Sequence, residues 1–203
     1  MAAKYIVFDT ETSGLRPENA NLLSVHFCVL DDKLNKIDEL NLNIKYPFYT
    51  IYTKALSVNK ISLEEHEKTA LFMNCARIKL KNFLYSVAKT KLIPIGHNIQ
   101  FDINFIKQSG LLSEIEYNKF MHVNYLDTIV IAQFLKSCNI IPFQISLKLS
   151  ILCAHFGINT TGNLHTAEYD VKLTIELFKK MQNKTASSNH DLISNKKRKF
   201  NCI

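Results

Sequence analysis

The sequence lacks several features that would point to particular classes of protein. It has no run of 18 consecutive apolar residues, so no membrane-spanning helix and no membrane partner are expected. Its five cysteines are an odd number without a C-x-x-C pair, which favours reduced thiols over a zinc site or a disulfide framework. It has no glycine-rich phosphate loop, so hydrolysis of nucleoside triphosphates is not indicated. Residues 4–9 are already strand-like, which leaves no room for a signal peptide, and we expect an intracellular protein.

The length and composition are those of one globular domain. The chain has 203 residues, of which 47% are hydrophobic and 21% are charged, which is enough for one buried core but little for two. We expect this domain to span residues 1–182. Residues 183–203 are rich in Ser, Asn and Lys and have little to bury, so we expect them to form a basic, disordered tail.

The net charge is +7, and more than half of it lies in the tail. Five basic residues against one acid give residues 183–203 a charge of +4, which leaves +3 on the body. A mildly positive body suits a nucleic-acid partner but does not show which chemistry is done. In the tail, Lys196-Lys197-Arg198-Lys199 resembles a nuclear-import signal, so we expect a nuclear location in a eukaryotic host and a cytoplasmic one otherwise. A phosphate-binding arm and simple solubility remain alternative interpretations of this run.

Hydrophobic periodicity predicts five strands and several helices. The expected strands are residues 4–9, 22–30, 34–44, 92–95 and 122–126. The expected helices are a short one capped by Ser62, then 74–88, 98–108 and 128–136, one capped by Ser146, and a last one over about 166–182. Residues 46–60 are expected to be an irregular surface connection. Strands first, then alternating strands and helices, indicate an α/β fold with a mixed sheet flanked by helices.

Asp9 and Glu11 stand at the end of the first expected strand and are the first candidate site residues. Residues i and i+2 of a strand project from the same face, so these two carboxylates point together. Two like charges at such a distance are unfavourable unless a proton or a cation neutralises them, and a hard divalent cation with oxygen ligands does so. The alternative is that both acids simply lie in solvent at a strand end, and the pair alone does not decide between the two.

Two further segments could complete such a site. In the first, a strand ends at Gly96 and a helix begins, so Asp102 lies near the first helical turn, where an acid also suits the helix dipole. In the second, His165 and Asp170 would lie about 140° apart if both were helical, at 3.6 residues per turn. Placing His165 in the loop before the helix and Asp170 in its first turn lets both face one site. Each segment is weak by itself, and the three together are informative.

The three segments in this order resemble the DEDDh exonucleases, the DnaQ-like group that includes the epsilon proofreading subunit of the bacterial replicase and the oligoribonucleases. The matching strings are FDTETSGL at residues 8–15, GHNIQFDINFI at 96–106 and HTAEYDV at 165–171. The resemblance covers residues 4 to 181. It implies an RNase H-like mixed sheet of about five strands flanked by helices, and a metal-dependent 3′→5′ exonuclease.

The resemblance also implies a two-metal mechanism carried by five residues. Asp9 would bridge two Mg²⁺ ions, for which Mn²⁺ can substitute. Glu11 and Asp170 would complete the site of one ion, and Asp102 would support the other through water. His165 would take the proton from the attacking water, since an imidazole with an ordinary pKa suits that role. The substrate would be the 3′ end of single-stranded DNA or RNA, and the product a nucleoside 5′-monophosphate.

Four residues are expected from the resemblance to contact the substrate. Thr12 and Leu15 follow the D-x-E pair, in a stretch that cradles the terminal nucleotide in similar enzymes. Asn98 and Phe101 are further candidates, although Phe101 suits the core equally well. One departure from the family is that residues 58–61 (VNKI) stand where many relatives carry a His-Gly pair, which puts substrate contacts from that segment in question.

The sequence leaves the biological role open within this family. DNA proofreading and RNA trimming use the same five residues, so they are not separated. A polymerase is a candidate partner, and no oligomeric state is predicted. The alternative from another class is a catalytically silent exonuclease-fold module that binds a polymerase or nucleic acid. Its signature would be the loss of one or more of the acids, whereas all five positions are filled.

Overall fold

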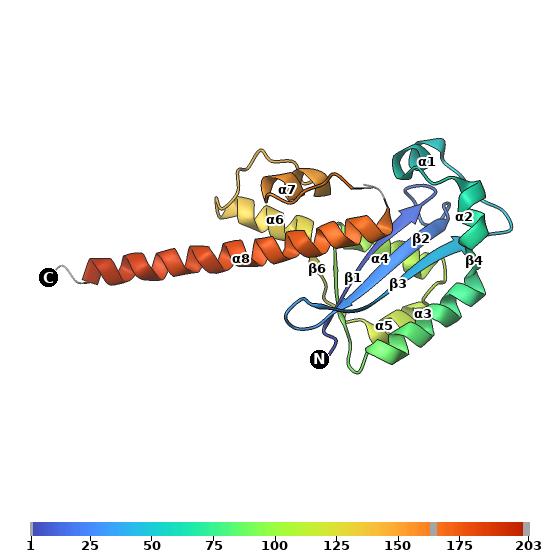
Figure 1. Cartoon of the computed structure of the whole chain (residues 1–203), viewed down its shortest axis with the longest axis horizontal. Helices are drawn as coiled ribbons and strands as arrows, with labels where there is room; N and C mark the ends of the chain where they lie inside the picture. The colour runs from blue at the N-terminus through green and yellow to red at the C-terminus, as the bar shows by residue number, and fades with distance from the viewer. Residues whose placement is uncertain (1, 163–165, 201–203) are drawn as a thin grey trace.

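The core of the protein is a mixed sheet. The structure is a computed structural model that describes residues 2–162 and 166–200, with side chains as far as residue 184. In these residues six strands form a sheet in the order β4-β3-β2-β1-β5-β6 (Figure 1). They are β1 (Tyr5–Thr12), β2 (Leu22–Leu30), β3 (Lys36–Lys45), β4 (Leu71–Phe72), β5 (Ile93–Gly96) and β6 (Leu126–Asp127). Strands β1, β2 and β3 pair antiparallel, whereas β5 pairs parallel with β1 and β6. The expected α/β fold is therefore confirmed, with the two-residue β4 as an additional strand. The strand expected at residues 122–126 was largely wrong, because β6 consists of Leu126 and Asp127 and residues 122–125 lie outside the sheet.

Helices surround this sheet. They are α1 (Thr53–Asn59), α2 (Leu63–Thr69), α3 (Met73–Val87), α4 (Ile99–Gln108), α5 (Glu114–Phe120), α6 (Thr128–Ser137), α7 (Leu149–His155) and α8 (Ala167–Phe200). None of the helices in the described residues is long and apolar enough to cross a membrane.

Helices α1, α5 and α8 differ from the sequence predictions. Helix α1 lies in the connection that was expected to be irregular. It was not predicted, because its seven residues are too few to show a helical period. Helix α5 was not predicted, for the same reason. Helix α8 continues to Phe200, past Gln182, where the last predicted helix was expected to end. That stretch has no apolar stripe from which periodicity could have detected a helix.

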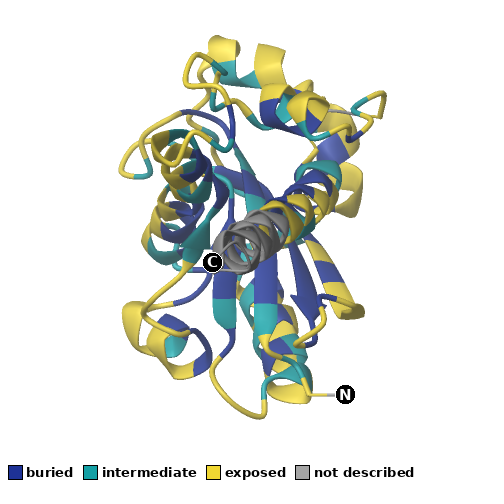
Figure 2. Ribbon diagram, turned by 90° about the vertical axis from the view of Figure 1, so that its left-hand side faces the viewer, coloured by how far each residue is buried: buried dark blue, intermediate teal, exposed yellow. Residues whose placement is uncertain are grey.

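Both faces of the sheet are covered, and β1 contributes to both layers. Ile6 and Phe8 pack on the face covered by α3 and α4, in the main hydrophobic cluster. Val7 points to the other face, where it packs with Val171 and Phe178 of α8. Every residue of β2 is buried, as Figure 2 shows for the centre of the sheet. Because side chains alternate along a strand, Asp9 and Glu11 project from the same face as Val7, beneath α8.

Side-chain caps define where several helices begin. Ser62 caps α2 by accepting from the Glu65 N–H, as predicted. Asp127 caps α6 and also accepts from the Asn98 and Ile99 N–H groups, so one carboxylate holds the starts of α6 and α4 together. The prediction that Ser146 caps a helix was wrong. Helix α7 begins only at Leu149. The Ser146 hydroxyl accepts from the Lys148 N–H, so it lies in the loop before the helix and does not cap it.

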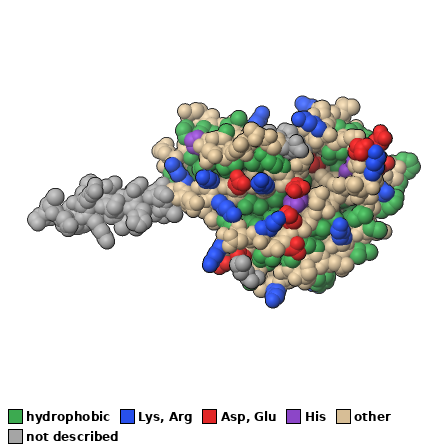
Figure 3. Space-filling model, in the orientation of Figure 1, with side chains coloured by type: hydrophobic (Ala, Val, Ile, Leu, Met, Phe, Trp, Pro, Cys, Tyr) green, Lys and Arg blue, Asp and Glu red, His purple; other side chains and the backbone are tan. Residues whose placement is uncertain are grey.

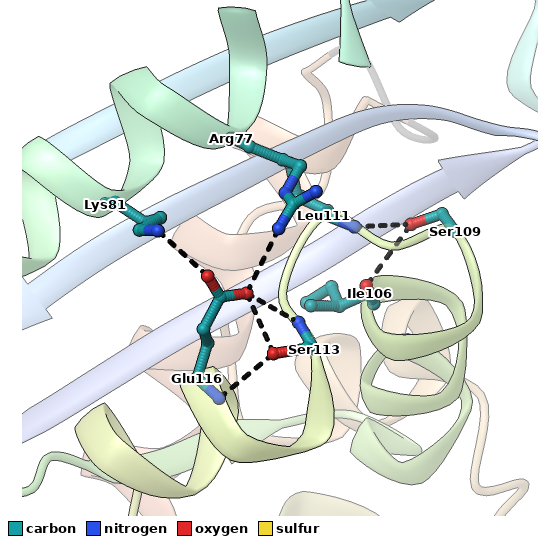
Figure 4. A network of polar contacts seen from close by, with 7 residues as sticks. All are labelled: Arg77, Lys81, Ile106, Ser109, Leu111, Ser113 and Glu116. Carbon is teal, nitrogen blue, oxygen red and sulfur yellow. Dashed lines mark hydrogen bonds and ion pairs between the residues drawn. The ribbon is translucent and has the colours of Figure 1, made fainter. Parts of the chain in front are cut away.

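A polar network centred on Glu116 joins α5 to α3 (Figure 4). Its carboxylate accepts from the N–H and the hydroxyl of Ser113, both at 2.9 Å, and closes a capping box. The same carboxylate pairs with Lys81 at 2.9 Å and with Arg77 at 3.5 Å. The Ser113 backbone bond, then Lys81 and the Ser113 hydroxyl, lower the pKa of Glu116 to about 2.

Replacing Glu116 by Ala should lower the free energy of unfolding by about 1–2 kcal/mol, because it removes a helix cap and two ion pairs at once. Since the folded pKa is depressed, this contribution is present above the unfolded pKa of about 4.3 and is lost as the pH falls through about 2. Urea denaturation at pH 7 and pH 3 measures both effects. Glu64→Ala, at an exposed acid in the first turn of α2, is the control and should change little. Equal losses in both variants would contradict the role of this network.

Candidate active site

Three carboxylates from distant parts of the chain meet at the end of β1. Asp9 and Glu11 project from the strand, and Asp170 lies in the first turn of α8, where the sequence predicted it. Helix α8 crosses β1 and β2 on that face (Figure 1). One oxygen from each of the three carboxylates lies within 4.8 Å of the others. Packing of α8 on the sheet thus completes a cluster that β1 begins.

Asp102 approaches the same strand end from α4, on the other side of the sheet. It is buried, and its Oδ1 accepts from the Thr10 N–H at 2.9 Å and from the Thr10 hydroxyl at 2.6 Å. It does not belong to the three-acid cluster, but it lies close enough to raise the pKa of both Asp9 and Glu11. The four predicted acids therefore converge. Asp9, Glu11 and Asp170 lie within 4.8 Å of one another, and Asp102 lies outside this group.

The cluster is electrostatically strained. Burial, followed by repulsion from Asp102, Glu11 and Asp170, raises the pKa of Asp9 well above its usual value. Burial and repulsion from Asp170 and Asp102 raise the pKa of Glu11 to about 8. Burial raises the pKa of Asp102 to about 7, against the hydrogen bonds from Thr10. Near neutral pH these acids must keep protons or take up a cation. Three hard oxygen donors within such a distance fit a divalent cation.

Asn59, which the sequence did not single out, also contacts this site. It is the last residue of α1 and is buried. Its Nδ2 donates to the Thr12 carbonyl at 3.1 Å, and its Oδ1 accepts from the Ile61 N–H at 3.2 Å. Its side chain also lowers the pKa of Glu11, against the larger effect of burial. The only signal in the sequence was that residues 58–61 depart from the family's His-Gly pair. Lys60, the residue after Asn59, has a left-handed backbone (φ 55°), a conformation that glycine adopts without strain.

Three of the four predicted substrate residues share one cavity beside Glu11. Thr12, Leu15 and Phe101 line a cavity of about 600 Å³. The rest of its wall comes from β1, the loop after it and α1, chiefly Arg16, Asn19, Tyr52, Lys54, Ala55, Val58 and Asn59. Leu15 is exposed, and Phe101 is half-buried against Phe105, with ring centroids 4.9 Å apart, so Phe101 belongs both to the cavity and to the edge of the core.

The fourth predicted residue, Asn98, lies apart from these three. It is exposed, has a left-handed backbone (φ 65°), and lines a second cavity of about 640 Å³ together with Asp170 and Lys148. The acids thus have cavities on both the Glu11 side and the Asp170 side. His165 lies outside the described residues, so its position relative to the acids stays a prediction.

Charges of both signs are interspersed over the described surface seen in Figure 3, beside the apolar side chains. The described part of this face has no large patch of one sign to attract a phosphate backbone. Attraction of phosphate to the site would depend on neutralising the acid cluster itself.

Comparison with known proteins connects this geometry to nucleases. The RNase_T family model, described as exonuclease, matches residues 6–178. The ribonuclease T of Wigglesworthia glossinidia brevipalpis is 29% identical over 193 residues, covering 88% of this chain and 84% of the relative. The PolC-type DNA polymerase III of Ureaplasma parvum serovar 3 is 27% identical over 183 residues, covering 89% of this chain but only 12% of the polymerase.

Solved structures show the same fold. Exonuclease I of E. coli in complex with a dT13 oligonucleotide superposes with a TM-score of 0.72 at 18% sequence identity. The superposition covers 95% of this chain and 44% of exonuclease I. The chain therefore spans most of a ribonuclease T, less than half of exonuclease I and about an eighth of a PolC polymerase.

The repulsion within the cluster predicts how stability depends on pH in metal-free protein. Glu11 releases its proton near pH 4.5 when unfolded but near pH 8 when folded, so stability present below pH 4.5 is lost as the pH rises to 8. Thermal unfolding in EDTA should show a decline of up to roughly 5 kcal/mol over this range, since about 3.5 pKa units at about 1.36 kcal/mol each are involved, and Glu11→Gln should reduce it. Mn²⁺ should restore the lost stability in the wild type but not in Asp9→Asn. An equally steep decline in Glu11→Gln would rule out this origin.

The left-handed Lys60 predicts a stabilising substitution. Lys60→Gly should raise the free energy of unfolding by about 0.5–1 kcal/mol, since relief of left-handed strain outweighs the greater freedom of glycine in the unfolded chain. Lys33→Gly is the matched control at an exposed turn lysine without a positive φ, and it should destabilise. Chemical denaturation of both variants measures the difference, and a loss of stability in Lys60→Gly would contradict the strain.

Proposed function

The chain belongs to the exonuclease family whose model it matches, and on that premise we propose that it hydrolyses phosphodiester bonds at the 3′ ends of single-stranded nucleic acid, releasing nucleoside 5′-monophosphates. The observation that carries this proposal is the meeting of Asp9, Glu11 and Asp170 within 4.8 Å, next to a cavity of about 600 Å³. The cavity supplies a place for the terminal nucleotide, and the acids lie where its 5′ phosphate would then be.

Divalent cations are part of the proposal. Asp9, Glu11 and Asp170 would hold them, with Asp102 in support from α4. We propose two Mg²⁺ ions, with Mn²⁺ as a substitute, because four carboxylates carry a formal charge of −4 that two divalent ions cancel. When bound, such a pair stabilises both the attacking and the leaving oxygen of an in-line displacement at phosphorus.

The residues of the chain itself would bind and orient the substrate. Leu15, Tyr52 and Val58 expose apolar surface on the wall of the cavity, against which a nucleobase can stack regardless of its identity. Thr12 and Phe101 complete this wall beside Glu11. On the Asp170 side, Asn98 and Lys148 line the second cavity and would contact the preceding nucleotide. His165, in the segment before α8, would accept the proton of the attacking water.

The polymer and the cellular role follow from the relatives only in part. Ribonuclease T is by its name an RNA enzyme, whereas PolC is a DNA polymerase, and the chain is similar to both. We propose that both single-stranded RNA and DNA ends are substrates. A polymerase remains a proposed partner, because the PolC likeness covers only a small part of that protein.

The test uses 5′-labelled single-stranded DNA and RNA oligomers incubated with the protein and Mg²⁺. A ladder that shortens from the 3′ end is expected, and Asp9→Ala should slow it by about 10³-fold, because loss of a cation ligand removes several kcal/mol of transition-state stabilisation. Asp38→Ala, at an exposed acid on β3, is the matched control and should cut at the wild-type rate.

Two results would count against the proposal. If Asp9→Ala cut as fast as the wild type, the activity would belong to another site or a contaminant. If no single strand released mononucleotides with Mg²⁺ or Mn²⁺, the chain would instead be a silent module that binds a polymerase or nucleic acid. The wild-type comparison of DNA and RNA also decides which polymer is preferred.

A further inference from the structure

The residue between the two acids of β1 has a structural role of its own. Strand β5 pairs with β1 only as far as Val7, opposite Ile95, and the chain leaves the sheet after Gly96. The Thr10 N–H donates not to a strand but to the carboxylate of Asp102. A side chain of α4 thus provides the acceptor for a strand N–H that would otherwise be buried without a partner, which is costly.

Both donors of Thr10 converge on the same oxygen of Asp102. The N–H lies 2.9 Å and the hydroxyl 2.6 Å from Oδ1, and both residues are buried, with exposed fractions of 7% and 3%. A carboxylate oxygen offers about two lone-pair directions, and at Oδ1 Thr10 takes up both. Oδ2 takes no part in these two bonds.

Alternation along β1 explains why the middle residue performs this task. Asp9 and Glu11 project toward α8, so Thr10 projects to the opposite face, where α4 packs. Three consecutive residues therefore act on both sides of the sheet. Asp9 and Glu11 point into the acid cluster, and Thr10, between them, holds Asp102 of α4.

We propose that Thr10 is a positioning residue of the metal centre, which holds Asp102 so that Oδ2 alone serves a divalent cation. This inference rests on the proposed function only in that it takes the acid cluster to be the cation site. A hard divalent cation such as Mg²⁺ or Mn²⁺ is the ligand. Removing a hydrogen-bond partner that orients a metal ligand commonly lowers the metal affinity by about 10- to 100-fold.

The experiment measures Mn²⁺ binding directly, by electron paramagnetic resonance and calorimetry, on full-length protein without substrate. Thr10→Val keeps the side-chain shape and the backbone bond but removes the hydroxyl donor. We expect it to weaken Mn²⁺ binding about 10- to 100-fold. Thr10→Ser restores the hydroxyl and should bind like the wild type. In nuclease assays, Thr10→Val should need more Mn²⁺ than the wild type for half-maximal rate.

A hydroxyl that only stabilises the fold would give a different pattern. Thr10→Val would then lower the melting temperature but bind Mn²⁺ as tightly as the wild type, and that result overturns the proposal. If Thr10→Val does not fold, Thr10→Ala removes the same donor with a smaller side chain, and the same comparison applies. Failure of the wild type to bind Mn²⁺ would also overturn it. A wild type that binds Mn²⁺ but cuts no strand would refute only the nuclease function.

Discussion

Repulsion among four carboxylates at one end of β1 is the constraint on which the site depends. Asp9, Glu11 and Asp170 meet within 4.8 Å, and Asp102 adds its charge from the other side of the sheet. Without a cation this arrangement opposes folding, so the packing of α8 and α4 on the sheet must supply the free energy that holds the acids together. With a divalent cation the same charges attract a common centre. Stability and chemistry are therefore coupled through one cluster.

Two of these acids have a polar side chain from another element beside them. Thr10 of β1 donates to Asp102, and Asn59 at the end of α1 donates to the Thr12 carbonyl and lowers the pKa of Glu11. Asp127, at the end of β6, ties the start of α4 to the start of α6. Because such bonds join the ends of strands to helices, they fix the positions of the helix starts and of the acids relative to the sheet.

Cavities flank the acids on both sides. The wall on the Glu11 side comes from the loop after β1 and from α1. Loops of this kind commonly carry binding residues on a rigid scaffold, which here is the sheet. The chain is similar to most of a ribonuclease T and to a small part of a PolC polymerase, so sequences similar to it occur in proteins of very different size.

The sequence by itself determined the sheet, its main helices and the acids, because these follow from local patterns: alternation along β1 puts Asp9 and Glu11 on one face, and Asp170 falls in the first turn of α8. Only the tertiary structure decided that Asn59 reaches the site, that Thr10 holds Asp102, and that Asn98 lines a different cavity from Thr12. The reason is separation along the chain. The Asn59 and Thr10 bonds join residues 47 and 92 positions apart, and no local periodicity encodes contacts of that kind.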